Sequence, residues 1–121
     1  MKNLILLFVA VVLVGCGVAR QSVQKGEVNG NKVNLAKLSL GMTKSQVLEI
    51  MGLAGKIEAY QTKTGGSMEF LIYRTVFTNK NDRDTSDKYW TPICLIDGKV
   101  VGWGRNFYDD TIKIRKEIIK N

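Results

Sequence analysis

The side chains best suited to covalent chemistry are two cysteines, Cys16 and Cys94, because the sequence contains no histidine. The lack of imidazole removes the commonest general base and the commonest metal ligand. Cys94 lies in an apolar run, Ile93–Ile96, which favours a buried small side chain over a reactive thiol. No serine lies in a recognisable nucleophile motif. The sequence therefore predicts a protein that is not an enzyme and that holds no cofactor or metal.

Acidic residues alternate between Asp82 and Asp87, a spacing faintly similar to that of a calcium-binding loop. The segment lacks the glycine at the sixth position and the closing glutamate of such a loop. We therefore interpret Thr78–Lys88 as a long, exposed and solvated loop.

Cys16 follows a different kind of segment. Lys2 precedes an apolar run, Leu4–Val14, which is shorter than the roughly 20 apolar residues that span a bilayer as a helix. The run ends in the sequence Leu13, Val14, Gly15, Cys16. This order of charge, apolar run, small residue and cysteine resembles the bacterial lipobox, in which the thiol is joined to a diacylglyceryl group and the chain is cut before the cysteine.

The resemblance implies that residues 1–15 are a lipoprotein signal peptide and that Cys16 becomes the lipidated first residue. A plain secretory signal that happens to carry a cysteine is the alternative. Two or more acyl chains, such as palmitate, anchor a protein stably. Gly17, in place of an aspartate, is similar to the sorting signal for the outer membrane. We therefore expect an outer-membrane lipoprotein whose domain faces the periplasm.

Length and charge limit the possible partners. Residues 16–121 suffice for one small domain. Eighteen basic residues against 11 acidic ones give a net charge of +7. In an exported lipoprotein this excess favours anionic head groups or acidic protein surfaces rather than nucleic acid. Improved solubility without a dedicated partner is the other explanation.

The polar, aperiodic residues 16–32 predict a flexible linker between the lipid anchor and a domain that spans residues 33–121. The strongest local signal follows, at Gly41, Met42, Thr43, Gln46, Val47 and Gly52. Thr43 and Gln46 have the spacing of a capping box, and Met42 and Val47 that of a hydrophobic staple. Gly52 is suited to end a helix. We therefore predict a helix of about eight residues between Thr43 and Gly52.

The rest of the chain favours strands. They are predicted at Lys56–Gln61, at an edge, and at Met68–Phe77, Tyr89–Ile96 and Lys99–Phe107. Asp97 and Gly98 form a favoured hairpin turn. Pro92 should face an edge, sit at a bulge or mark a late strand start. The tail from Asp109 to Lys120 favours a short helix, although Thr111–Arg115 also alternates like a strand.

The expected fold is α+β: two short N-terminal helices packed on a three- to four-stranded antiparallel meander, a two-layer sandwich. Family resemblance rests on Leu38–Val47, Met51–Gly52, Glu69–Arg74 and Asp97–Val101. These segments resemble the BamE-like lipoproteins, also called the SmpA/OmlA family, over about residues 29–105. The resemblance implies an ααβββ fold and an accessory role in the complex that assembles outer-membrane β-barrels. An inhibitor of the β-lactamase-inhibitor type, or a ligand-sensing lipoprotein domain, is the alternative function.

Aromatic side chains gather near the last predicted hairpin. We expect Tyr89, Trp90, Trp103 and Arg105 to form a candidate interaction surface, with core packing as the alternative for the aromatic residues. Basic residues crowd toward the C-terminus and would suit either anionic lipid or a solvated helix face. The expected partners are therefore envelope proteins, among them the β-barrel assembly complex, together with the membrane that holds the anchor.

Overall fold

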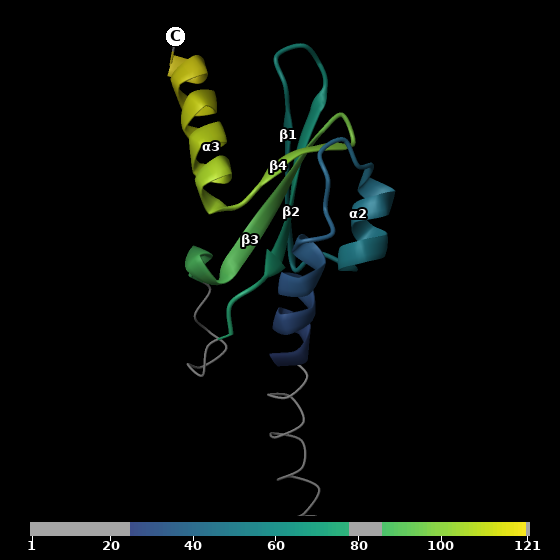
Figure 1. Ribbon diagram of the computed structural model, residues 1–121. Helices are drawn as coiled ribbons and strands as arrows, with labels where there is room; N and C mark the ends of the chain where they lie inside the picture. Colours follow the sequence, from purple (N-terminus) through teal and green to yellow (C-terminus); the bar gives the residue numbers. More distant parts are fainter. Residues whose placement is uncertain (1–24, 78–85, 121) are drawn as a thin grey trace, which may run out of the picture.

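The computed structural model describes residues 25–77 and 86–120, so the expected signal peptide and Cys16 lie outside the described residues. The elements follow in the order helix 25–35, α2 (Lys44–Met51), β1 (Lys56–Gln61), β2 (Ser67–Arg74), the 3₁₀ helix η1 (Asp87–Tyr89), β3 (Trp90–Ile96), β4 (Lys99–Trp103) and α3 (Arg105–Lys120). The four strands form an antiparallel sheet in the order β1-β2-β3-β4 (Figure 1). The predicted α+β class is confirmed. In the described part, no helix is long and apolar enough to cross a membrane.

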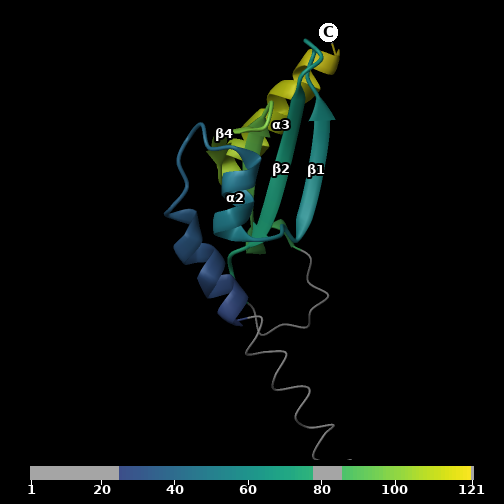
Figure 2. The ribbon, with the colours of Figure 1, turned by 90° about the vertical axis from the view of Figure 1, so that its right-hand side faces the viewer.

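Helices cover both faces of the sheet. Helix 25–35 and α2 lie on one face and α3 on the other (Figures 1 and 2). The α2-face core consists of Leu38, Val47, Met51, Leu71, Tyr73, Ile93, Leu95 and Val100. The smaller α3-face core consists of Phe70, Ile72 and Cys94, and is flanked by Tyr60, Met68, Trp90, Tyr108 and Ile112. Thus α3 adds a third layer to the sandwich expected from the sequence.

Helix 25–35 corrects the predicted linker, because residues 25–32 are helical rather than flexible. Val28 is only 1% exposed, and Asn31 is buried. The Asn31 side-chain amide donates to the Arg74 carbonyl at 2.8 Å, which satisfies a polar group that would otherwise be costly to bury. Val28, Asn31 and Leu35 recur at helical spacing, but the polar residue between them hides the apolar period from sequence analysis.

The predicted capping of α2 is confirmed. Thr43 Oγ1 accepts from the Gln46 amide at 3.3 Å, and Gln46 Oε1 accepts from the Thr43 amide at 2.9 Å. Val47 is fully buried, and Met42 packs at the edge of the same core. Gly52 ends the helix with a φ of 75°, and its amide donates to the Leu48 carbonyl. The motif therefore fixes both ends of α2.

Two predicted strands are too long. β2 ends at Arg74, because the Thr75 and Val76 amides turn to the carbonyl of Tyr89 in η1. β4 ends at Trp103, and the chain turns at Gly104 into α3, which begins at Arg105 rather than near Asp109. The tail is therefore helical, and the alternative strand there is wrong.

Pro92 lies on the inner strand β3, where it pairs with Ile72 of β2. On its other side, the last pair of the β3·β4 ladder is Ile93 with Trp103. Beyond that pair, Pro92 supplies only its carbonyl, which accepts from the Gly104 amide at 2.9 Å. The bulge lies elsewhere, at Cys94 and Leu95. The missing N–H of Pro92 is tolerated because β4 ends before it would pair with this residue.

Candidate functional site

The predicted aromatic surface is divided between the two faces of the sheet. Trp90 packs at the α3-face core, whereas Trp103 packs at the α2-face core. The cause is the register: Trp103 pairs with Ile93, three positions from Trp90, and an odd spacing along a strand changes the face. The two tryptophans therefore do not share one surface.

Tyr89 and Arg105 are held by the fold as well. Tyr89 is buried. Arg105 Nη2 donates to the carbonyls of Asp87 and Trp90, at 3.1 and 3.2 Å, and so ties the start of α3 to the start of β3. Lys56 Nζ lies 4.4 Å from the centroid of the Trp90 ring, a distance typical of a cation–π contact. These contacts give all four residues a packing role, and their use as an interaction surface stays a prediction.

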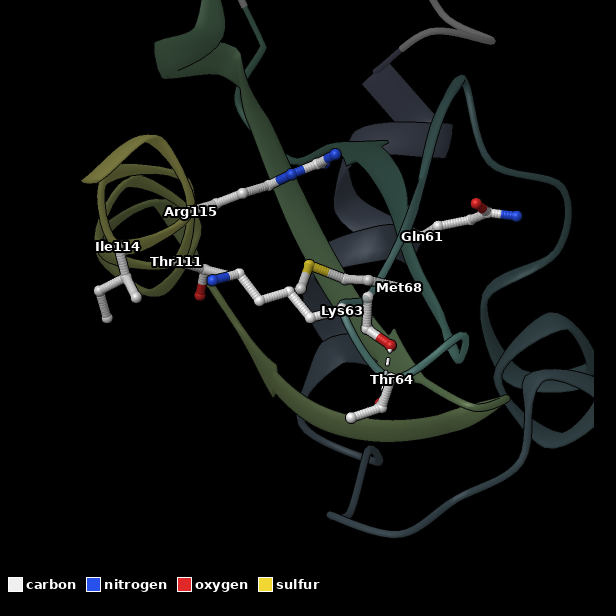
Figure 3. A pocket seen from close by; sticks show the side chains of 8 residues that line it. Gln61, Lys63, Thr64, Met68, Thr111, Ile114 and Arg115 are labelled. Carbon is white, nitrogen blue, oxygen red and sulfur yellow. Dashed lines mark hydrogen bonds between the residues drawn. The ribbon is translucent and has the colours of Figure 1, made fainter. Parts of the chain in front are cut away.

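A groove opens at the other end of α3, between this helix and the β1–β2 hairpin (Figure 3). Its volume is about 510 Å³, within the range of small-molecule sites. The lining residues are Gln61, Thr62, Lys63, Thr64 and Met68 of the hairpin, and Thr111, Ile114 and Arg115 of α3. Two of these residues are cationic and none is acidic.

A polar network lies beside the groove, between β1 and α3. Glu58 Oε2 accepts from the hydroxyl of Tyr60 at 3.0 Å and from that of Tyr108 at 2.6 Å. Burial, followed by the bond to Glu58, raises the pKa of both tyrosines, and the shift is larger for Tyr108. The Phe70 ring meets Tyr108 edge to face at a centroid distance of 4.8 Å. This network holds α3 to the sheet with both phenols protonated at neutral pH.

Arg115 connects this network to the groove. Its guanidinium carbon lies 4.0 Å from the centroid of the Tyr60 ring. Nη1 is buried and has no hydrogen-bond partner. Tyr108, Ile112 and Arg115 recur at spacings of four and three residues, so they share the face of α3 that lies on the sheet. A cation without an ion-pair partner among the described residues therefore lies at the wall of the groove.

The two edges of the sheet differ. Residues Gly41–Lys44 cover β4: the Gly41 amide donates to the Val100 carbonyl at 2.8 Å, and the Lys44 amide to the Gly98 carbonyl at 3.0 Å. Within the described residues, no backbone group pairs with the outer side of β1. Leu53 and Ile57 beside it are 90% and 60% exposed. We call Leu53, Ile57 and Ala59, together with the free backbone of β1, the β1 edge.

The described part contains one cysteine, Cys94. Cys94 is fully buried, and burial raises the pKa of its thiol to about 11, so the nucleophilic thiolate is disfavoured. Among the described residues, no three His, Cys, Asp or Glu side chains gather as a metal-binding group. The groove and the β1 edge are therefore the candidate functional features.

Comparison with known proteins identifies the family. Residues 9–110 match the model of the family described as "Protein of unknown function (DUF3192)", and this match covers most of the chain. The protein belongs to that family. Neither the curated proteins nor the solved structures contain a match. The matched segment ends before Thr111, Ile114 and Arg115, so the wall that α3 gives the groove lies beyond it.

Proposed function

We propose that this protein is a non-enzymatic, lipid-anchored envelope protein that binds another protein along the β1 edge. The observation that carries the proposal is the free outer side of β1 next to the exposed side chains of Leu53 and Ile57. An unpaired strand offers a row of amides and carbonyls on which an extended segment of a partner can add a strand. Exposed apolar side chains beside it would add contact area.

The signal-like start and the segment Leu13–Cys16 support anchoring by a diacylglyceryl group on Cys16. Gly17 supports the outer membrane as the location, with the domain in the periplasm. The resemblance of the capped helix to BamE-like lipoproteins supports a role as an accessory factor in β-barrel assembly. The partner would then be a component of that assembly complex.

The first test concerns the anchor. Replacing Cys16 with Ser should abolish lipid labelling and release the protein from membranes, because the diacylglyceryl group would be joined to this thiol. Membrane fractionation after a salt wash measures this release. A Cys16→Ser protein that stays on the membrane through the wash would contradict lipid anchoring.

The second test concerns the β1 edge. A photo-crosslinking amino acid at Ile57 of the full-length chain should capture a partner in cells, whereas the same residue at Val101 of the covered strand β4 should not. Recovery of β-barrel assembly components from position 57 would support the assembly role. Equal capture at both positions, or capture of no protein by a folded and lipidated chain, would overturn binding at the β1 edge. Capture of a secreted hydrolase would instead favour the inhibitor alternative.

A further inference from the structure

The groove between the β1–β2 hairpin and α3 combines an apolar lining with one-sided charge. Met68 of β2 and Ile114 of α3 supply apolar surface, and Lys63 and Arg115 supply positive charge from opposite walls (Figure 3). None of the eight lining residues is acidic. A ligand that matches this lining has an apolar body and an anionic group.

Arg115 is the lining residue best suited to bind an anionic group. A guanidinium has five N–H donors. Within the described residues, the buried Nη1 has no hydrogen-bond partner and the side chain has no ion pair, although it is half-buried. A buried donor without an acceptor costs free energy, and the cost is larger for a charged group. Because Arg115 also lines the groove, an anion bound there would lie beside this positive charge.

One oxygen of the carboxylate in the network is already engaged. Glu58 Oε2 accepts hydrogen bonds from the hydroxyls of both Tyr60 and Tyr108. Arg115 instead makes a cation–π contact with the Tyr60 ring, which holds the guanidinium in place without supplying a negative charge. Its position is therefore set in advance, which lowers the entropy cost of binding an anion.

The position of the groove argues against the anchoring bilayer as the source of the ligand. The groove lies at the hairpin end of the domain, whereas helix 25–35, through which the chain enters the described domain, lies at the opposite end (Figure 1). A molecule that reaches the groove would therefore come as a monomer rather than from the surface to which the chain is tethered.

We propose that this groove binds a fatty acid, with its carboxylate on Arg115 and Lys63 and its alkyl chain along Met68 and Ile114. A carboxylate accepts two parallel hydrogen bonds from a guanidinium, and such charge-assisted bonds are among the strongest in proteins. The alkyl chain gains from the removal of its apolar surface from water. This site is separate from the β1 edge and does not depend on protein binding there.

The experiment uses the full-length chain in nanodiscs of zwitterionic lipid and a photoreactive diazirine analogue of dodecanoic acid. After irradiation, peptide mass spectrometry should find saturable label in residues 61–68 and 105–115. The corresponding dodecanol analogue, which lacks the carboxylate, should label this region at least about tenfold less, the size expected for a charge-assisted hydrogen bond.

Arg115→Gln should raise the probe concentration needed for half-maximal labelling about tenfold or more. Lys113→Gln is the matched control, because Lys113 is exposed on the same helix and does not line the groove. It removes the same charge and should change labelling by less than about twofold, within the usual effect of a distant surface charge. Ile114→Asp, at a side chain 58% exposed, should abolish labelling without unfolding the domain, and so covers the case in which Arg115→Gln does not fold.

Three results would overturn the proposal: equal labelling by acid and alcohol, labelling by folded Arg115→Gln that matches the unaltered chain, or label confined to other segments. Displacement of the probe by an acidic peptide but not by unlabelled dodecanoate would assign the groove to a protein ligand instead. Crosslinking from Ile57 is a separate readout, so failure of one proposal is distinguishable from failure of the other.

Discussion

The two faces of the sheet are built from the same strands but by different means. The α2 face holds eight buried residues, nearly all aliphatic, closed by a helix with a complete capping box. Among the described side chains, the α3 face has three buried core residues, surrounded by aromatic rings, a shared carboxylate and cations. Aliphatic packing is the efficient way to stabilise a small domain, because each buried apolar side chain contributes about 1.5–3 kcal/mol. We therefore expect the α2 face to contribute more to stability than the α3 face, where the proposed fatty-acid groove lies.

Adjacent residues of β2 test this difference most directly. Leu71 faces the α2-face core and Ile72 the α3-face core, and both lose the same number of carbons on change to alanine. Both substitutions should destabilise by about 2–5 kcal/mol, with Leu71→Ala at the upper end because its surroundings are more completely closed. Chemical denaturation of the two variants measures the difference. An Ile72→Ala cost equal to or greater than that of Leu71→Ala would break the comparison.

Gly102 tests how α3 is seated on the sheet. A Cβ at this position would lie 2.6 Å from the Phe107 ring, so Gly102→Ala should push the start of α3 off β4. We expect a loss of about 1–3 kcal/mol, typical of overpacking. In a protein that already carries Phe107→Ala, the same Gly102→Ala substitution should cost much less. Denaturation of both single variants and the double variant measures this difference as a double-mutant cycle. Additive costs would show that the ring is not the obstacle.

Removal of the Tyr108 hydroxyl tests the polar network and should cause the smallest loss of stability of the three tests. Tyr108→Phe removes the hydrogen bond to Glu58 and should cost about 1 kcal/mol at neutral pH. Because the folded state raises the pKa of Tyr108 above its ordinary value of 10.0, the unfolded chain releases this proton first. The contribution is therefore fully present below about pH 10 and is lost as the pH rises through the higher pKa of the folded state.

Denaturation at about pH 8 and about pH 11 measures this dependence, since the groups common to both proteins cancel in the comparison. The advantage of the unaltered chain over Tyr108→Phe should shrink at the higher pH. An advantage that stays constant or grows would show that the Tyr108 phenol is not held protonated by the fold.

Local chemistry made α2 and the hairpin turn predictable. Thr43, Gln46 and Gly52 act within one short segment, so their spacing alone specifies the capped helix. Asp97 and Gly98 adopt positive φ values of 49° and 79°, as the predicted turn requires. The edge strand Lys56–Gln61 also has the predicted bounds.

Contacts between distant segments decided the rest. Helix 25–35 depends on the bond from Asn31 to Arg74, 43 positions away, and the network depends on the bond from Tyr108 to Glu58, 50 positions away. The separation of Trp90 from Trp103 depends on a register that no local pattern contains. By itself, the sequence determined the α+β class and the elements with local capping or turn signals. Only the tertiary structure decided the face of each aromatic residue and the cation at the groove, because burial and charge pairing there depend on which distant strands and helices meet.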